Sequence, residues 1–130
     1  MTNQQFPKGI LPVLPVASID KTADYYVDTL TFKENFRQKS PEGVSINAQL
    51  TFEESTLMLN LNAEQAPQEG GGVYFWIRLY ETDIEVYYKN LVAAGVNVVD
   101  ELKDQFWGDR SFVIKDCNNY FIAFNQVIQK

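Results

Sequence analysis

The side chains that most often perform enzymatic chemistry are scarce in this sequence. The chain contains no histidine, and Cys117 is its only cysteine. A reactive thiol needs a base or a strongly positive environment, whereas the neighbours of Cys117 are Lys115 and Asp116 in a predicted turn. Buried carboxylates can act as general acids or bases, but no pair of acidic residues is singled out by its spacing. The sequence gives little support to nucleophilic catalysis, and Cys117 is interpreted as a turn residue.

Length and composition indicate an ordinary globular protein of one domain. The chain has 130 residues, of which 45% are hydrophobic and 14% aromatic, enough for a core without disulfides. The net charge of -6 disfavours nucleic acid, which clustered Lys and Arg recognise, and would suit a cationic ligand. The single cysteine excludes an internal disulfide. Because neither a signal peptide nor a long apolar run is evident, we expect a cytoplasmic protein that does not contact membranes.

The first half of the chain predicts a strand, a helix and three further strands. Pro12 and Pro15 lie in an apolar run and point to an edge strand, because proline cannot donate a backbone hydrogen bond. Ser18 is placed to cap a helix. The apolar positions of this helix recur at helical spacing and predict one buried stripe, made of Ile19, Ala23, Tyr26 and Leu30. Further strands are predicted over 32–38, 44–52 and 57–61, and the strand 44–52 is expected to bury Val44, Ile46, Ala48, Leu50 and Phe52 on one face.

The second half repeats this order after a linker. Residues 62–72 contain Pro67 and three consecutive glycines, and read as a linker. A strand is predicted over 73–80, and Thr82 to Glu85 has the form of a capping box. The helix that follows is expected to use Ile84, Tyr88 and Leu91 and to end at Gly95, and Val96 to Val99 to begin a strand. A hairpin is predicted last, with strands Arg110–Lys115 and Tyr120–Gln126 around a turn at Asp116–Asn119.

Two such modules, at about 9–62 and 72–127 within one domain of residues 1–130, resemble the vicinal oxygen chelate superfamily. That superfamily includes glyoxalase I, extradiol dioxygenases and bleomycin resistance proteins. The segment 106–126, with Trp107-Gly108 ahead of its hairpin, resembles the closing hairpin, and 83–96 (DIEVYYKNLVAAGV) resembles the second helix. The resemblance implies an α+β fold in which two β-α-β-β-β modules form a cup-shaped, half-barrel sheet. A ferredoxin-like domain is the alternative, since it too is built from short α/β repeats.

The resemblance also implies where a metal would be held in related enzymes. Their ligands are His, Glu or Gln on the first and last strands of each module. Transferred to this chain, the positions are Leu11, Met58, Trp76 (or, one residue earlier, Phe75) and Ala123. None of these side chains is a hard metal ligand, and the turn that usually reads D-P-D-G-N is Asp116-Cys117-Asn118-Asn119. We therefore expect neither a metal nor another cofactor.

The same face of the implied cup has an apolar and aromatic character with a few polar groups. Strand alternation places on it Leu11, Val13, Met58, Asn60, Tyr74, Trp76, Arg78, Phe121, Ala123 and Asn125. Such a lining suits a flat or amphipathic organic ligand, with Arg78, Asn60 and Asn125 fixing its orientation. The alternative is that these side chains only fill the interior of the cup.

Phe106 and Trp107 precede the last hairpin. In the bleomycin-resistance group, which this Trp-Gly pair resembles, nearby residues border the ligand groove. The two rings are predicted to clamp a planar group at the rim. The alternative is that Trp107 anchors the loop to the sheet.

The resemblance is closest to the bleomycin-resistance-like group, whose members give antibiotic resistance. It implies a non-enzymatic protein that sequesters an aromatic or cationic compound. The alternative is a divalent-metal-dependent lyase, isomerase or dioxygenase. A homodimer is expected, because the superfamily commonly completes its groove with a second chain and because Pro12 and Pro15 leave the first strand as an edge.

Overall fold

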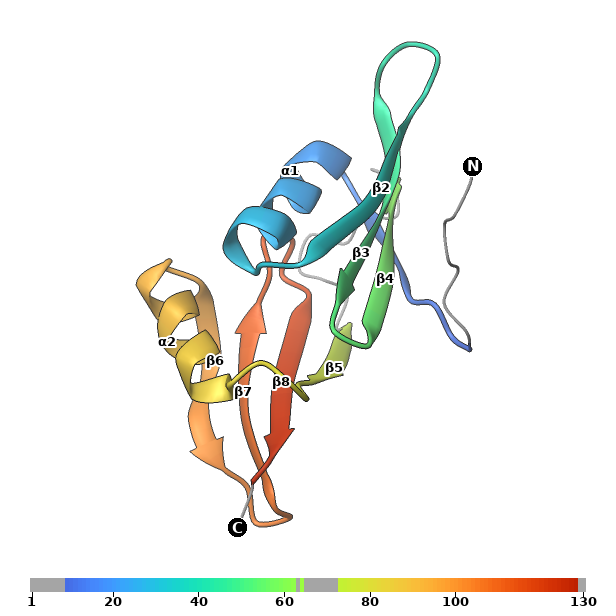
Figure 1. The fold of residues 1–130 in the computed structure, drawn as a ribbon. Coiled ribbons are helices and arrows are strands. Elements are labelled where there is room, and N and C mark those ends of the chain that lie inside the picture. The colour runs from blue at the N-terminus through green and yellow to red at the C-terminus, as the bar shows by residue number, and fades with distance from the viewer. Residues whose placement is uncertain (1–8, 63, 65–72, 129–130) are drawn as a thin grey trace. The chain divides into compact units, whose positions relative to one another are not determined.

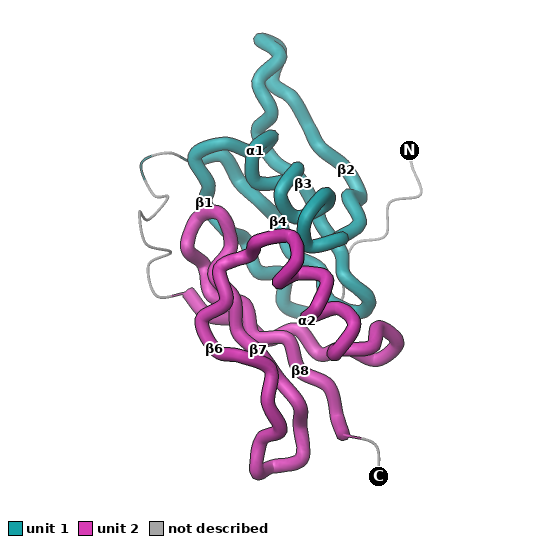
Figure 2. The backbone as a smooth tube through the Cα atoms, turned by 90° about the vertical axis from the view of Figure 1, so that its left-hand side faces the viewer, with its two compact units in different colours: residues 1–67 teal, residues 68–130 magenta. Residues whose placement is uncertain are grey.

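The computed structural model describes residues 9–62, 64 and 73–128. The chain divides into two compact units, residues 1–67 and 68–130, drawn in teal and magenta in Figure 2. Within the described residues each unit contains a helix and a four-stranded mixed sheet (Figure 1). The predicted α+β fold with two β-α-β-β-β modules is therefore confirmed.

The first unit places its first and last strands side by side. Its elements are β1 (Val13–Val16), α1 (Ile19–Asp24), η1 (Tyr25–Thr29), β2 (Lys33–Lys39), β3 (Ser45–Phe52) and β4 (Ser55–Leu61). The strand order is β1-β4-β3-β2, with β1 parallel to β4 and the other pairs antiparallel. The predicted edge position of the first strand is confirmed, and its Pro12 contributes a carbonyl that accepts the Met58 amide at 2.9 Å.

The first helix forms as its sequence predicts. The Ser18 hydroxyl accepts the Lys21 amide at 3.2 Å, which satisfies one of the free donors at the helix start. The four predicted stripe residues, Ile19, Ala23, Tyr26 and Leu30, are all buried. The helix widens into the π-turn η1, in which the Leu30 amide bonds to the Tyr25 carbonyl. Thr31 then ends it with a φ of 64°, a left-handed conformation that favours glycine.

The strand β3 departs from its predicted alternation. Ala48, Leu50 and Phe52 are buried as expected, but Val44 and Ile46 are 52% and 37% exposed. The register shifts where Ile46 is the extra residue between two cross-strand pairs with β2, and a bulge of this kind breaks the two-residue period. Beyond it, the β2–β3 hairpin extends past the N-terminal end of α1 (Figure 1).

The second unit repeats the topology. Its elements are β5 (Tyr74–Arg78), α2 (Ile84–Ala93), β6 (Asn97–Asp104), β7 (Asp109–Lys115) and β8 (Phe121–Val127). The order is β5-β8-β7-β6, with β5 parallel to β8. Its helix packs on an aromatic core, in which the Tyr87 ring meets Phe124 edge-on at 5.1 Å and Tyr88 meets Phe112 at 4.9 Å. Tyr87 is the more deeply buried tyrosine, whereas the sequence spacing had favoured Tyr88.

The predicted capping box at the start of α2 is wrong. The N-cap residue is Asp83, whose carboxylate accepts the amides of Glu85 and Val86 at 2.9 and 3.2 Å. The Glu85 side chain pairs instead with Arg110, so it does not close the reciprocal bond that a capping box requires. The helix ends as predicted, because Gly95 follows it with a φ of 83°.

The closing hairpin is confirmed. Asp116 organises its turn by accepting the amides of Asn118 and Tyr120 at 2.8 and 2.9 Å, and Asn119 adopts a φ of 66°, which asparagine tolerates. Cys117 is exposed in this turn. The predicted linker 62–72 lies almost wholly outside the described residues. None of the helices in the described parts of the chain is long and apolar enough to cross a membrane.

Replacing Thr31 with glycine is expected to stabilise the protein. The left-handed conformation strains a β-branched residue, and its relief should exceed the entropic cost of glycine and the lost bond from the Thr31 hydroxyl to the Leu30 carbonyl. We expect T31G to raise the free energy of unfolding by about 0.5–1 kcal/mol in urea denaturation. Asn119→Gly is the matched control and should change less, because asparagine already accepts this φ. A destabilised T31G would show that the hydroxyl bond dominates.

Because Asp83 and not Thr82 caps α2, substitutions of these two adjacent residues should differ in their effect on stability. Asp83→Ala should lower the free energy of unfolding by about 1 kcal/mol, because it removes the acceptor of two helix amides. Thr82→Ala keeps that acceptor and should lower the free energy of unfolding by only about 0.3 kcal/mol. Urea denaturation of the two variants decides the question, and the reverse order of stability would restore the capping box.

Candidate functional site

The second sheet presents aromatic side chains on the face opposite α2, which is called here the helix-free face. Alternation along β5 buries Ile77 while leaving Tyr74 and Trp76 each 51% exposed. Trp76 is paired in register with Ala123 of β8. Because the alanine side chain is small, the space beside the indole is not filled.

This space is a cavity of about 220 Å³, formed wholly within the second unit. Its lining combines aromatic rings with both signs of charge. The lining residues are Tyr74, Trp76, Asp100, Lys103, Gln105, Trp107, Ser111, Phe112, Val113 and Ala123. Three of the predicted ligand-binding residues, Tyr74, Trp76 and Trp107, are thus brought together here.

Trp107, which lines the cavity, makes a side-chain hydrogen bond that the sequence did not predict. Its indole nitrogen donates to a carboxylate oxygen of Asp109 at 3.3 Å. Arg78 donates to both oxygens of the same carboxylate, at 3.3 and 3.1 Å. The Asp109 side chain is only 9% exposed. Through these bonds it joins Arg78 on β5 to Trp107 in the loop before β7.

Phe106 behaves differently from its neighbour. Its ring is 96% exposed and does not line the cavity. It meets the Trp107 ring at an interplanar angle of 86° and a centroid distance of 4.9 Å. At this angle the two rings cannot both stack face-on against one planar group, and the clamp at the rim stays a prediction.

Phe121 and Asn125 complete the predicted set within this unit but do not line the cavity. The Phe121 ring stacks on Tyr74 with centroids 6.0 Å apart and accepts the Lys115 ammonium at 5.2 Å from its centre. It therefore supports Tyr74 from one side. Asn125 is fully buried and donates to the Ile77 carbonyl at 3.5 Å, while its side-chain oxygen has no hydrogen-bond partner among the described residues.

Met58 and Asn60 belong to the first unit. They lie on β4, where Leu57 and Leu59 are buried, Met58 is half-buried and Asn60 is exposed. The two residues therefore share the face that the buried leucines leave, and neither lines the cavity of the second unit.

The metal positions implied by the sequence carry no suitable donors. Trp76 pairs with Ala123, and in the first unit Met58 pairs with Val13. Neither these residues nor Leu11 has a side chain that can donate to a hard metal ion. The described residues contain no group of three or more His, Cys, Asp or Glu placed to hold a metal ion. The residues at these positions do not fit a hard divalent metal.

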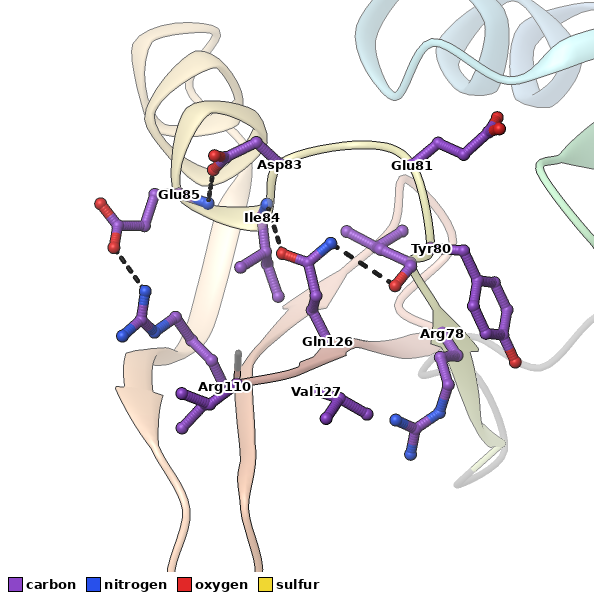
Figure 3. Close-up of a pocket in the computed structure, with 11 residues that line it drawn as sticks. Arg78, Tyr80, Glu81, Asp83, Ile84, Glu85, Arg110, Gln126 and Val127 are labelled. Carbon is purple, nitrogen blue, oxygen red and sulfur yellow. Dashed lines mark hydrogen bonds and ion pairs between the residues drawn. The ribbon is translucent and has the colours of Figure 1, made fainter. Parts of the chain in front are cut away.

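A larger cleft of about 700 Å³ lies at the start of α2 and is shown in Figure 3. Gln126 stands in its centre, where it accepts the Ile84 amide at 3.2 Å and donates to the Leu79 carbonyl at 3.5 Å (Figure 3). It also donates to the Thr82 carbonyl at 2.7 Å. Arg110 binds Glu85 on one side and Asp104 on the other. These bonds lower the pKa of the Asp104 carboxyl and raise that of the Arg110 guanidinium.

The two cavities differ in what they offer a ligand. In the larger cleft, Gln126 and Arg110 bind the first residues of α2 from the sheet, and Asp83 caps the same helix. Its exposed ring is that of Tyr80, whereas the smaller cavity has two half-exposed indoles, Trp76 and Trp107. Since exposed aromatic faces are what a planar organic compound requires, the cavity on the helix-free face is the better candidate despite its size. Arg78 borders the cleft and, through Asp109, connects to Trp107.

The polar residues in and beside this cavity were not predicted from the sequence. Asp100, Lys103, Gln105, Ser111 and Asp109 were not singled out. Strand spacing could not have indicated Asp109, because Trp107 lies in the turn before β7 and Arg78 lies on a different strand. The predicted strand began one residue too late, at Arg110, whereas β7 begins at Asp109.

Comparison with known proteins agrees with this fold. The sequence profile of the Glyoxalase/Bleomycin resistance protein/Dioxygenase superfamily matches residues 10–124. The uncharacterized protein Mb0911c of Mycobacterium bovis is 31% identical over 129 residues, which cover 94% of this chain and 85% of that protein.

Two solved structures illustrate the range of proteins with this fold. A glyoxalase-related enzyme from Clostridium phytofermentans is 18% identical with a TM-score of 0.73, covering 98% of this chain and 100% of that one. TnmS3, an antibiotic binding protein from Streptomyces sp. CB03234, is 22% identical with a TM-score of 0.68, covering 95% and 100%. At these identities the likeness concerns the fold. With the profile spanning nearly the whole sequence, the chain belongs to the Glyoxalase/Bleomycin resistance protein/Dioxygenase superfamily.

Proposed function

We propose that the protein binds a small aromatic or cationic compound without transforming it, as bleomycin-resistance-like proteins do. The observation that carries the proposal is the cavity on the helix-free face, where Trp76 and Trp107 each leave about half of their surface exposed beside Ala123. Large rings held half exposed on a rigid strand bind planar groups through stacking and cation–π contacts.

The size of the cavity limits what it can hold. Ligand pockets typically measure about 300–1,000 Å³, and this one has about 220 Å³. One ring system fits, and the rest of a larger compound would extend over neighbouring surface such as the exposed face of Tyr74. The ligand class is therefore one with a planar end group.

Charge supports the same class. The chain carries a net charge of -6, which raises the local concentration of cations around it. The antibiotic-binding protein TnmS3 has the same fold, so a non-catalytic role is compatible with this scaffold. Antibiotic sequestration is the biological form of the activity that we propose.

A homodimer is also proposed, as in the sequence analysis. β1 is an edge strand of its sheet, and an uncovered edge is available for pairing. Exposed apolar side chains such as Ile10 and Phe106 would be shielded in an interface between two copies.

Size-exclusion chromatography with light scattering at micromolar concentration tests the dimer. We expect twice the 14.9 kDa mass of the chain, because a two-fold interface would bury the exposed apolar side chains. A species at the chain mass would remove the dimer from the proposal without affecting the cavity.

The binding function is tested by ligand-induced stabilisation and by one substitution. Bleomycin and the planar cation ethidium should each raise the melting temperature in a thermal-shift assay, since a ligand that binds only the folded state stabilises it. Trp76→Ala should weaken ethidium binding about tenfold by calorimetry, as expected for loss of a stacking and cation–π partner. Trp76→Phe keeps a ring and should lose less.

Tyr80→Ala is the matched control. Tyr80 is an exposed aromatic residue of the same unit that lines the larger cleft and not the cavity. Its removal should leave ethidium affinity unchanged. If Y80A weakens binding and W76A does not, the ligand occupies the cleft of Figure 3 and the site proposed here is wrong.

A further inference from the structure

The Asp109 carboxylate is the only point at which the described polar contacts of Arg78 and Trp107 meet. It lies at the start of β7, opposite Val127, and is 6% exposed as a residue. The carboxylate receives three N–H groups, two from the Arg78 guanidinium and one from the Trp107 indole. A buried carboxylate with three donors is held in one orientation, and it holds its donors in turn.

We infer that Asp109 is a positioning and specificity-determining residue of the cavity on the helix-free face, fixing the Trp107 ring and selecting cationic over anionic planar ligands. This inference rests on the proposed function and adds to it the residue that sets the preference for cations. Asp109 acts through Trp107 and Arg78, since it does not itself line the cavity.

The first half of the inference concerns the position of Trp107. The ring lies in a loop before β7, and its neighbour Phe106 is almost fully exposed. A half-exposed indole in such a loop has several accessible rotamers. The bond to Asp109 selects the one that lines the cavity, so that less conformational freedom is lost when a ligand stacks on the ring.

The second half concerns charge. The cavity is lined by one acid and one base, Asp100 and Lys103. Beside it, Asp109 neutralises Arg78. With Asp109 ionised the four groups sum to zero, and without it Arg78 would leave one uncompensated positive charge. Ionised Asp109 therefore removes a local preference for anions, so that the chain's net charge of -6 favours a cation at the site.

The position of Trp107 is tested without any ligand. Trp76 and Trp107 are the only tryptophans of the chain, so Trp76→Phe leaves Trp107 as the sole reporter. In that background, D109A should raise acrylamide quenching of Trp107 about twofold, because a ring that is 50% exposed becomes accessible on all sides. D109N retains an acceptor oxygen and should keep the protection. Unchanged quenching in D109A would overturn the positioning role.

The charge is tested in the same single-tryptophan protein with ionic quenchers. D109N should increase quenching by iodide and decrease quenching by caesium, because it uncovers the Arg78 charge near the indole. Asp104→Asn is the matched control, since Asp104 is also an arginine-paired carboxylate and the change in net charge is the same, but it contacts Arg110 and does not line the cavity. Equal effects of D109N and D104N would overturn the selectivity.

The affinities for a planar cation and a planar anion test whether Asp109 controls charge selectivity in ligand binding. Relative to the wild type, D109N should bind ethidium about fivefold more weakly and the planar anion anilinonaphthalene sulfonate about fivefold more tightly. D104N should change neither. If the wild type binds ethidium and D109N leaves the ratio of the two affinities unchanged, the inference fails although the proposed function stands. If the wild type binds neither probe, the proposed function fails, and the quenching results alone decide what Asp109 does.

Discussion

The parallel pairing of β5 with β8 is the contact on which the candidate site depends. Its register places Trp76 opposite Ala123 and Arg78 opposite Asn125, while Ile77 and Phe124 pair on the face that α2 covers. A shift of one residue would turn the indole into the core and an isoleucine toward solvent, which strand geometry forbids once one face is buried. Packing of the helix therefore fixes which side chains remain available to a ligand.

The same register in the first unit explains why the cavity occurs in the second. There Val13 lies opposite Met58, and Pro15 lies opposite Asn60. The pair that corresponds to Trp76 and Ala123 is thus an aliphatic residue facing a long flexible one. Without a large ring beside a small side chain, this register leaves no flat aromatic wall. Two copies of one topology have acquired different chemistry on corresponding faces.

The fold followed from the sequence because its main signals are local. The stripe Ile19, Ala23, Tyr26 and Leu30, the glycine after α2 and the Asp116 turn each depend on spacing within one element, and spacing is visible in a sequence. The predictions were wrong where contacts with neighbouring elements determine the local structure. The bulge at Ile46 depends on pairing with β2. The Glu85 side chain does not bond back to the start of α2, because it pairs with Arg110 on β7.

The site was accessible from the sequence only in its aromatic part. Tyr74 and Trp76 follow from alternation along one strand. The polar residues Lys103 and Ser111 come together only through the pairing of β6 with β7, whose register is shifted twice and is not encoded in either strand alone. Asp109 joins Trp107, two residues before it in a turn, to Arg78, 31 residues before it on β5, and neither contact leaves a periodic signal in the sequence.

The side chains that form the core and those of the proposed binding site lie on opposite faces of the same strands. Phe124, Ile122 and Ile77 are almost completely buried on the face that α2 covers, where truncating one large side chain typically costs about 2–5 kcal/mol. Trp76 and Tyr74 keep half of their surface in solvent, so their contribution to folding is correspondingly smaller. Substitutions on the helix-free face can therefore change what is bound while the core keeps the register. In the proposed function, this separation places the specificity of the chain in the few side chains that surround Ala123.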